Sequence, residues 1–463
     1  MAWDFTTEPE FQQKLDWMDE FVRNEVEPLD LLFPHLTYHR IEDPLKVLVD
    51  QLKDEVRARD LWACHLDPDL GGQGYCQLKL ALMNEILGRS SWAPIVFGTQ
   101  APDTGNAEII AAYGTPQQKE RWLTPLLNGE VFSCYSMTEP QGGSDPTLIR
   151  TRAVRDGDEW VISGEKFFSS NLREASFLIV MAVTDPDVSP YQGMSMFLVP
   201  SDAPGIRVLA NIGLGNEPFG EGMHAHVRYE DVRVPHENLL GGEGQAFAVA
   251  QRRLGGGRIH HAMRSVAGAK RYFEMLCERV LSRSTQGSLL ATKQMVQEVV
   301  ADSWIQIQQF RLLVLYTAWL IDQSSAAATR QYVAACKVLA AEVLTDIGAK
   351  TQHLHGALGL SNLMHLDGGG AAMGVVDGPT EVHKVTIARQ VLKDHRPSPD
   401  AWPTQFKPRQ LTEARRRFDD LLERRVPDAG TRQAFGDLLR GSAAPDELVK
   451  QMQEYLDATS GNL

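Results

Sequence analysis

The part of this sequence with the strongest chemical signal is a run of small polar residues and glycines at 137–145. It reads Met-Thr-Glu-Pro-Gln-Gly-Gly-Ser-Asp and contains Met137, Thr138, Gly143 and Ser144. Paired glycines let backbone N–H groups come close to an anion or an aromatic heterocycle. The same residue types also form ordinary turns, and the chain has neither a GxxxxGK[ST] nor a GxGxxG phosphate motif. The residues alone leave a ligand-binding loop and a plain turn both open.

Three pairs of histidines are candidates for a metal site. They are His224 and His226 on an expected strand, His260 and His261 at the start of an expected helix, and His353 and His355 at the end of another. None of the pairs has cysteine or carboxylate neighbours at the spacing of metal ligands. We therefore expect no metal site.

The composition is that of a folded enzyme-sized chain. It has 463 residues, of which 43% are hydrophobic and 23% are charged, so a purely disordered or fibrous protein is excluded. With 46 basic and 60 acidic residues the net charge is −14, which gives no general attraction to nucleic acid or anionic lipid. The five cysteines are scattered without a CxxC pair, which favours reduced thiols. No export signal or membrane-length apolar run is found, so we expect a cytoplasmic protein with no integral membrane segment.

The elements that must position these residues change in kind along the chain. Residues 1–130 are expected to form an α-helical domain, because apolar residues recur at helical spacing after proposed capping boxes at Thr7–Glu10 and Thr115–Gln118. Residues 131–240 are expected to form a β-barrel or sandwich, with a hairpin turn at Asp156–Gly157. The predicted strands are 150–154, 159–163, 177–183, 194–199, 206–210 and 225–229.

Helical periodicity returns after the middle segment. Long stretches at 258–282, 289–322 and 329–355 predict a four-helix bundle over 241–395. Prolines at 397, 399, 403 and 408 predict a stiff linker, and residues 396–463 are expected to form that linker plus a helical extension. One face of this extension would carry Leu411, Ala414, Phe418, Leu421 and Leu422, and another Leu448, Met452, Tyr455 and Leu456.

The motifs together resemble the acyl-CoA dehydrogenase family of flavoproteins. The resemblance rests on Thr138–Pro140, Gly143–Asp145 and the segment Gly164–Ser170 (GEKFFSS), with further matches at Gln100–Asn106 (QAPDTGN) and Gly257–His261 (GRIHH). It covers about residues 5–395, in the family's order of helices, β-barrel and helix bundle. The last two matches look most similar to the long-chain and hydroxyacyl-CoA dehydrogenase subfamily, which in animals is fused to a kinase-like domain.

The resemblance implies a FAD site near the glycine-rich loop. Met137 and Thr138 would hydrogen-bond the pyrimidine side of the isoalloxazine, Ser170 would face flavin N5, and Phe168 would cover the ring. A fixed hydroxyl at N5 makes chemical sense, because N5 accepts the hydride. Gly143 and Ser144 would lie near the phosphates of FAD or of acyl-CoA, so that Ser144 counts as both cofactor-binding and substrate-binding.

The second half of the implied cofactor site would come from a neighbouring subunit. The segment Arg283–Gly287 resembles the family's RxxFG segment, and Arg283 would pair with the FAD pyrophosphate. A helix-surface arginine beside a glycine cap is the alternative. The other residues that the resemblance assigns to the cofactor are Thr285, Gln294, His353, Gly356, Thr380 and Glu381.

The implied catalytic base is Asp377. The segment Val375–His383 resembles the family's base segment, with aspartate in place of glutamate, and the base would remove the α-proton of the thioester. Burial by substrate would raise the pKa of this carboxyl. The alternative is that Asp377 is a helix N-cap ahead of Gly378–Pro379. Arg258 is implied to bind substrate, at the CoA phosphates or at a polar acyl substituent.

The resemblance therefore implies an acyl-CoA dehydrogenase of fatty acid β-oxidation. Such an enzyme forms a trans-2-enoyl-CoA, transfers a hydride to FAD and passes electrons to an electron-transfer flavoprotein, and a homodimer or homotetramer follows from the role of Arg283. Acyl-CoA oxidases and flavin monooxygenases on the same fold remain alternatives. So does a catalytically silent subunit or scaffold, in which a shortened glycine-rich segment (Leu366–Ala372) and the basic tail serve assembly. An acyl group with an oxygen substituent at C4 is a further variant.

Overall fold

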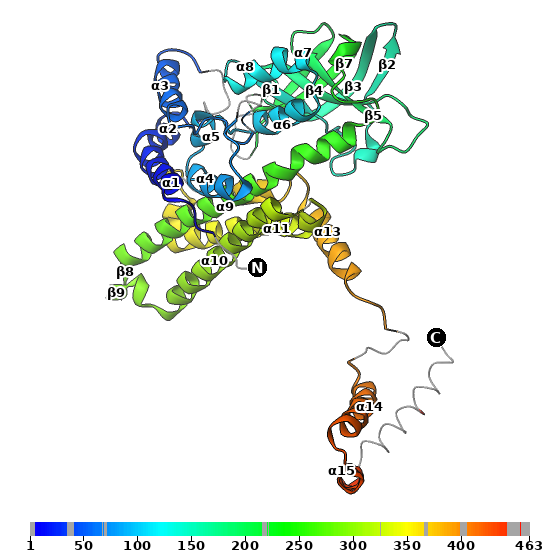
Figure 1. Ribbon diagram of the computed structural model, residues 1–463. Helices are drawn as coiled ribbons and strands as arrows, with labels where there is room; N and C mark the ends of the chain where they lie inside the picture. The colour runs from blue at the N-terminus through cyan, green and yellow to red at the C-terminus, as the bar shows by residue number, and fades with distance from the viewer. Residues whose placement is uncertain are drawn as a thin grey trace. The chain divides into compact units, whose positions relative to one another are not determined.

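The computed structural model describes most of the chain, namely residues 5–34, 41–66, 68, 72–214, 220, 222–324, 326–364, 369–398, 405–441 and 454. The chain forms two compact units, residues 1–390 and 391–463. Within the first unit, helices come first, strands follow, and long helices end the unit (Figure 1). The predicted order of a helical domain, a β domain and a second helical domain is confirmed.

The N-terminal part of the first unit is helical. Its helices are α1 (Pro9–Phe21), α2 (Glu27–Leu32), α3 (Leu45–Arg57), α4 (Gln77–Leu87), α5 (Ala93–Val96), α6 (Asp103–Tyr113), α7 (Pro116–Gln118) and α8 (Thr124–Leu127). Helix α1 buries Phe11, Leu15, Met18 and Phe21, so the apolar stripe expected there is confirmed. These side chains join one hydrophobic core with residues of α3 to α5.

The two proposed capping boxes have different outcomes. At the start of α7, Thr115 Oγ1 accepts a hydrogen bond from Gln118 N, and Gln118 Oε1 accepts one from Thr115 N, so this box is confirmed. The box at Thr7 is wrong, because α1 begins at Pro9 with Glu8 in the N-cap position and without a side-chain cap hydrogen bond. The Glu8 carboxylate instead pairs with Lys79 of α4.

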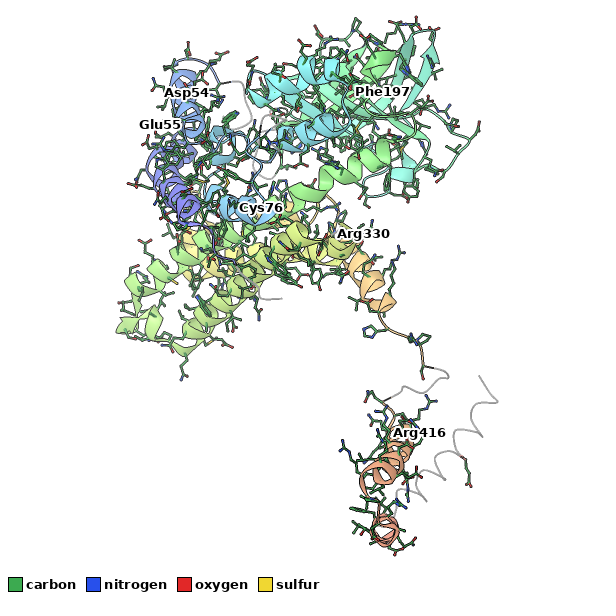
Figure 2. All side chains as sticks on the ribbon, viewed as in Figure 1. Asp54, Glu55, Cys76, Phe197, Arg330 and Arg416 are labelled. Carbon is green, nitrogen blue, oxygen red and sulfur yellow. The ribbon has the colours of Figure 1, made fainter. Side chains whose placement is uncertain are left out.

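The middle domain is a curled seven-stranded sheet. Its strands are β1 (Phe132–Ser136), β2 (Arg152–Asp156), β3 (Glu159–Ser170), β4 (Ala175–Val183), β5 (Met194–Pro200), β6 (Ile206–Ile212) and β7 (His224–Pro235). The strand order is β1-β4-β2-β3-β7-β6, and β5 pairs with β4. Strand β1 also meets β3, with Tyr135 opposite Ser170, so the sheet closes on itself like a barrel. Phe197 of β5 lies in its core (Figure 2).

The six predicted strands correspond to β2 to β7. Strands β3 and β7 are longer than predicted, because they pair with each other along most of their length. Strand β1 was not predicted. It is a short run with two serines among five residues, and it lies parallel to β4 and depends on that pairing.

Three long helices dominate the rest of the first unit. The elements are α9 (Ala246–Ser282), the hairpin strands β8 (Ser284–Thr285) and β9 (Ser288–Leu289), α10 (Gln294–Gln323), α11 (Ala326–His355), α12 (Gly369–Met373) and α13 (Thr380–Lys393). Helices α9, α10 and α11 share a core with α4. Gly88, at the end of α4, permits this packing, because a Cβ there would lie 2.5 Å from the Arg264 Cα of α9. In the glycine-rich segment Leu366–Ala372, residues 366–368 lie outside the described residues. Residues 369–372 belong to α12.

The second unit contains helices α14 (Lys407–Arg425) and α15 (Ala429–Gly441). Phe418 and Phe435 join them through an edge-to-face contact with ring centroids 5.9 Å apart. The second predicted apolar face, Leu448 to Leu456, lies outside the described residues. Among the helices that the structure describes, none has the length and hydropathy needed to cross a membrane.

Candidate active site

The loop after β1 is held in place by a buried ion pair. Lys166 of β3 donates to Glu139 Oε1 at 2.8 Å and to the carbonyl oxygen of Met137 at 2.9 Å. Both charged side chains are almost fully buried. Burial raises the pKa of Glu139, but Lys166 and the Thr151 hydrogen bonds lower it more, so the pKa lies below its usual range. This pair fixes the backbone of the predicted flavin-binding residues Met137 and Thr138.

An aromatic ring and a hydroxyl lie at the C-terminal end of β3, beside this loop. Phe167 N donates to Thr138 O at 2.8 Å, which joins the end of the strand to the loop. The Phe168 side chain is 41% exposed, and its φ of +54° is rare for a bulky residue. Ser170 Oγ lies 2.8 Å from His224 Nδ1 of β7. An exposed ring next to a fixed hydroxyl fits a flat heterocycle such as an isoalloxazine.

The second glycine of the pair and the serine after it lie on an exposed turn. Gly143 and Ser144 are exposed, and a Cβ placed on Gly143 would meet no atom within 4 Å. Asp145 accepts from Thr147 N at 2.9 Å and so closes the turn. The position has room for a ligand phosphate, and the geometry is also that of a capped turn.

Asp377 lies in the loop between α12 and α13, in contact with α9. Its φ is +55°, and Gly378 follows at +106°. Arg258 Nε donates to the carbonyl oxygen of Asp377 at 3.2 Å, and His261 Nε2 lies 3.5 Å from its Oδ2. Thr380 N, at the start of α13, bonds to Gly374 O rather than to the Asp377 carboxylate. The N-cap alternative for Asp377 is therefore wrong.

Three cationic side chains and one histidine lie near the Asp377 carboxylate. Burial raises the pKa of Asp377, but His261, Arg253, Lys337 and Arg258 together lower it below its usual range. Lys337 of α11 is buried and donates to Met373 O at 2.8 Å. Arg330, also on α11, adds positive charge near Arg258 (Figure 2). In the absence of substrate this carboxyl is ionised at neutral pH.

One side chain, Arg253 of α9, connects the base to the flavin loop. Its guanidinium stacks 3.9 Å above the Tyr135 ring, and it also contributes to the charge around Asp377. Tyr135 contacts the first residue of this loop, because its hydroxyl lies 3.7 Å from the Met137 Sδ. Arg253 Nε donates to Asn106 Oδ1 at 3.0 Å. The predicted base therefore lies close to Tyr135, on the strand that leads into the predicted flavin loop.

The QAPDTGN segment, residues 100–106, holds β1 in place through hydrogen bonds. Asn106 Nδ2 donates to Ser133 Oγ at 2.9 Å, and Asp103 Oδ1 accepts from Ser133 N at 2.8 Å. Gln100 donates to the other oxygen of Asp103 at 3.0 Å. Burial raises the pKa of Asp103 to about 6 despite these hydrogen bonds. The segment therefore acts here as a structural support.

The Arg283 group lies at the other end of α9. Arg283 is the exposed C-cap of α9, Thr285 is in β8, and Gln294 begins α10. In the described part of the chain, the Arg283 guanidinium makes no ion pair. At 1.5 Å of rise per residue, the 25 residues from Arg258 to Arg283 span about 38 Å. A single chain therefore does not bring Arg283 to the Asp377 site.

The remaining predicted cofactor residues lie near helix ends. His353 and Gly356 are exposed at the end of α11, close to the Arg283 end of the molecule, where Arg279 donates to His355 O at 3.4 Å. Thr380 and Glu381 begin α13 next to Asp377; Thr380 is half-buried and Glu381 is exposed. The structure thus forms two groups, one around Asp377 and the flavin loop and one around Arg283.

The histidine pairs do not gather into a metal centre. His226 pairs with Glu165 at 3.1 Å, His224 bonds to Ser170, and His261 faces Asp377. The described residues contain no group of three or more His, Cys, Asp or Glu side chains that could hold a metal ion.

Models of three domains of one family match the chain in sequence. They are the acyl-CoA dehydrogenase N-terminal domain at residues 8–130, the middle domain at 134–232 and the C-terminal domain at 244–392. This chain belongs to the acyl-CoA dehydrogenase family. Members of the family are flavin-dependent dehydrogenases, which agrees with the exposed ring and hydroxyl on β3.

Similar curated proteins carry family names. A Mycobacterium tuberculosis protein named probable acyl-CoA dehydrogenase FadE2 is 39% identical over 84% of this chain and 93% of its own length. Acyl-CoA dehydrogenase family member 10 of Mus musculus is 36% identical over 83% of this chain, and family member 11 of Rattus norvegicus is 37% identical over 76%. This chain spans only 37% and 46% of the lengths of those two animal proteins.

Solved structures share the fold. A putative acyl-CoA dehydrogenase from Mycobacterium abscessus superposes with a TM-score of 0.77 at 36% identity, over 84% of this chain and all of that one. The FAD complex of PigA superposes with a TM-score of 0.74 at 20% identity, over 85% of this chain and all of that one, which shows likeness of fold alone.

Sequence reasoning assigned no role to several residues that the structure places at the site. They are Tyr135, Lys166, His224, Arg253 and His261. Lys166 and His261 lie inside the motifs GEKFFSS and GRIHH, so the motifs could have indicated a role for them. No sequence pattern indicated a role for Arg253 or Tyr135, because their contact joins α9 to a strand that the sequence did not predict.

Proposed function

We propose that this chain is a FAD-dependent acyl-CoA dehydrogenase that converts an acyl-CoA thioester to the trans-2-enoyl-CoA. The observation that carries the proposal is the position of the Asp377 carboxylate, which interacts electrostatically with Arg253 and with Tyr135 of the strand that leads into the flavin loop. A base on one side of a substrate slot and a hydride acceptor on the other is the arrangement that an α,β-elimination of two hydrogens needs.

Asp377 would act as the base. It is ionised before substrate binds, and the loop that carries it is anchored to α9 by the Arg258 contact. When the acyl chain displaces water, the loss of solvation disfavours the carboxylate and raises its pKa toward that needed to hold an α-proton. The Asp377 N–H would polarise the thioester oxygen. Arg258 would bind substrate through its remaining N–H groups, at a CoA phosphate or a polar acyl substituent.

Residues of two chains would hold FAD. Met137, Thr138, Phe168 and Ser170 would bind the isoalloxazine, Gly143 and Ser144 would lie near phosphate, and Thr380 and Glu381 would border the same site. When bound, the flavin supplies the acceptor for the hydride that leaves Cβ. Its pyrophosphate would be held by Arg283 of a second copy, with Thr285, Gln294, His353 and Gly356 beside it. The distance along α9 and the unpaired guanidinium support this assignment and hence a homodimer or homotetramer.

The electron acceptor would be an electron-transfer flavoprotein, as the family resemblance implies. Such a protein, from Acidaminococcus fermentans, is named in the description of one solved structure that is 25% identical to this chain and superposes with a TM-score of 0.72 over 85% of it. We place the reaction in fatty acid β-oxidation, which supplies acyl-CoA thioesters as a class.

An anaerobic absorbance titration tests the proposal. The purified protein is titrated with short, long, branched and 4-hydroxylated acyl-CoAs, and one of them is expected to bleach the flavin band. Mixing the reduced protein with dioxygen should give slow reoxidation, because rapid reoxidation would indicate an oxidase. A protein that takes up no FAD would refute the flavoprotein assignment. Bound flavin that no thioester bleaches would refute the reaction.

A further inference from the structure

The backbone of Asp377 is held in place by contacts that do not involve its carboxylate. A non-glycine residue is disfavoured in the left-handed region, so the loop must be held by other contacts. One contact is the Arg258 hydrogen bond to the Asp377 carbonyl oxygen. A second restriction comes from His383, because a Cβ on Gly378 would lie 3.0 Å from its Nε2. The position of the Asp377 Cα is therefore set by α9 and α13 together.

The Asp377 carboxylate has one close partner. His261 Nε2 lies 3.5 Å from Asp377 Oδ2, and no other side chain in the described residues lies within ion-pair distance of this carboxylate. Arg258 and His261 are three residues apart on α9 and so face the same side of the helix. One helix face thus contacts both the backbone and the side chain of Asp377.

The charges around His261 and Asp377 determine the protonation states of these two side chains. Burial lowers the pKa of His261 to about 4; Asp377 opposes this shift, while Arg264, Lys337 and Arg253 add to it. Around Asp377 the facing groups are His261, Arg253, Lys337 and Arg258, and its pKa lies below the usual range. At neutral pH the pair is a carboxylate next to a neutral imidazole, which can present an Nε2–H donor.

We propose that His261 is a positioning residue for the base: its Nε2–H is directed at Asp377 Oδ2 and leaves Oδ1 to take the α-proton. This inference rests on the proposed function. A gap of 3.5 Å is longer than a hydrogen bond, and such contacts commonly tighten when substrate binds. In the reaction the Cα–H bond breaks and its proton goes to Oδ1. The electron pair of that bond forms the Cα=Cβ bond as a hydride leaves Cβ with its own pair, and a flavin bound at the site would supply the acceptor for this hydride.

A positioned carboxylate matters more for aspartate than for glutamate. Asp377 has one methylene less, so its reach to the α-carbon cannot be recovered by side-chain rotation. A misplacement of about 1 Å in a reacting group can lower a rate about 100-fold. Removing the donor at Oδ2 lets the carboxylate rotate away, and the rate of α-proton removal should fall by that factor while substrate affinity changes little.

Two substitutions at the same position test the inference. Glutamine carries an Nε2–H donor that can take the place of the histidine Nε2–H, and leucine carries none. We expect anaerobic flavin bleaching at saturating acyl-CoA to slow about 100-fold in His261→Leu and less than about 10-fold in His261→Gln, with substrate Kd within about threefold in both. His260→Gln is the matched control, since His260 is the buried neighbour of His261 on α9 and Asp377 is not among the groups that shift its pKa. Its rate should stay within about threefold of wild type, and urea midpoints of all variants confirm that they fold.

A second readout does not depend on bleaching. The protein is labelled at the histidine ring Cε1, and His261 is assigned by the resonance missing from His261→Gln. Asp377→Asn should shift this resonance and lower its titration midpoint, because the neighbouring carboxylate favours the imidazolium. If no thioester bleaches the wild type but this shift is seen, the contact stands and the dehydrogenase reaction fails. The inference is overturned if Asp377→Asn leaves the resonance unmoved, if His261→Leu bleaches like wild type, or if His261→Gln is as slow as His261→Leu.

Discussion

Replacing Lys166 by methionine should strongly destabilise the chain, because it removes one half of a buried ion pair. Lys166 is the cation for Glu139 and a hydrogen-bond donor to Met137 O, and both charged groups are nearly inaccessible to solvent. Methionine has a similar volume and is apolar, so packing changes little. The loss is therefore electrostatic.

The expected magnitude follows from what remains unpaired. Breaking a buried ion pair from one side costs about 3–5 kcal/mol. Glu139 keeps backbone donors, Arg150 N at 2.7 Å and Thr151 N at 2.9 Å, which favours the lower half of that range. The orphaned Met137 carbonyl adds about 1–3 kcal/mol. We expect a loss of about 4–7 kcal/mol of unfolding free energy, together with a reduced FAD-to-protein ratio, because Met137 and Thr138 are no longer fixed.

Urea unfolding of the FAD-free protein, followed by far-UV circular dichroism, measures this loss without a contribution from cofactor binding. The double variant Lys166→Met/Glu139→Gln is the control. It leaves no buried charge, so it should be at least about 1 kcal/mol more stable than Lys166→Met alone. A loss below about 1 kcal/mol in the single variant, or losses that simply add in the double variant, would refute the reasoning.

Three further results are expected. Asp377→Asn should retain FAD but slow bleaching by acyl-CoA about 100- to 10,000-fold, and retained bleaching contradicts the base assignment. Arg283→Ala should lower the FAD-to-protein ratio and the oligomer size on gel filtration together, with Arg283→Lys as the milder control; an effect on neither would make it a surface arginine. Both ring nitrogens of His65 are shielded from solvent and desolvation lowers its pKa to about 4, so the unfolded chain binds its proton more readily. The free energy of unfolding should therefore fall by up to about 3 kcal/mol as the pH is lowered from about 6.5 to about 4. In His65→Gln this fall should be smaller, as measured by the urea midpoint at each pH.

The local parts of the fold could be predicted, because they depend on neighbouring residues. The stripe on α1, the box at Thr115 and the strands β2 to β7 follow from periodicity and turn chemistry. The box at Thr7 could not be judged locally, because Glu8 pairs with Lys79 from another helix. Strand β1 could not be found either, since its partners β3 and β4 come later in the chain.

The same distinction between local pattern and tertiary packing holds for the candidate site. The sequence by itself determined the family motifs, the three-part order of the chain and the residue types available for chemistry, because these are properties of composition and spacing. Only the tertiary structure decided that His261 faces Asp377, that Arg253 joins the base to β1, and that Arg283 lies a helix length away. Contacts between residues far apart in sequence depend on how helices and strands pack, and no local pattern encodes that packing.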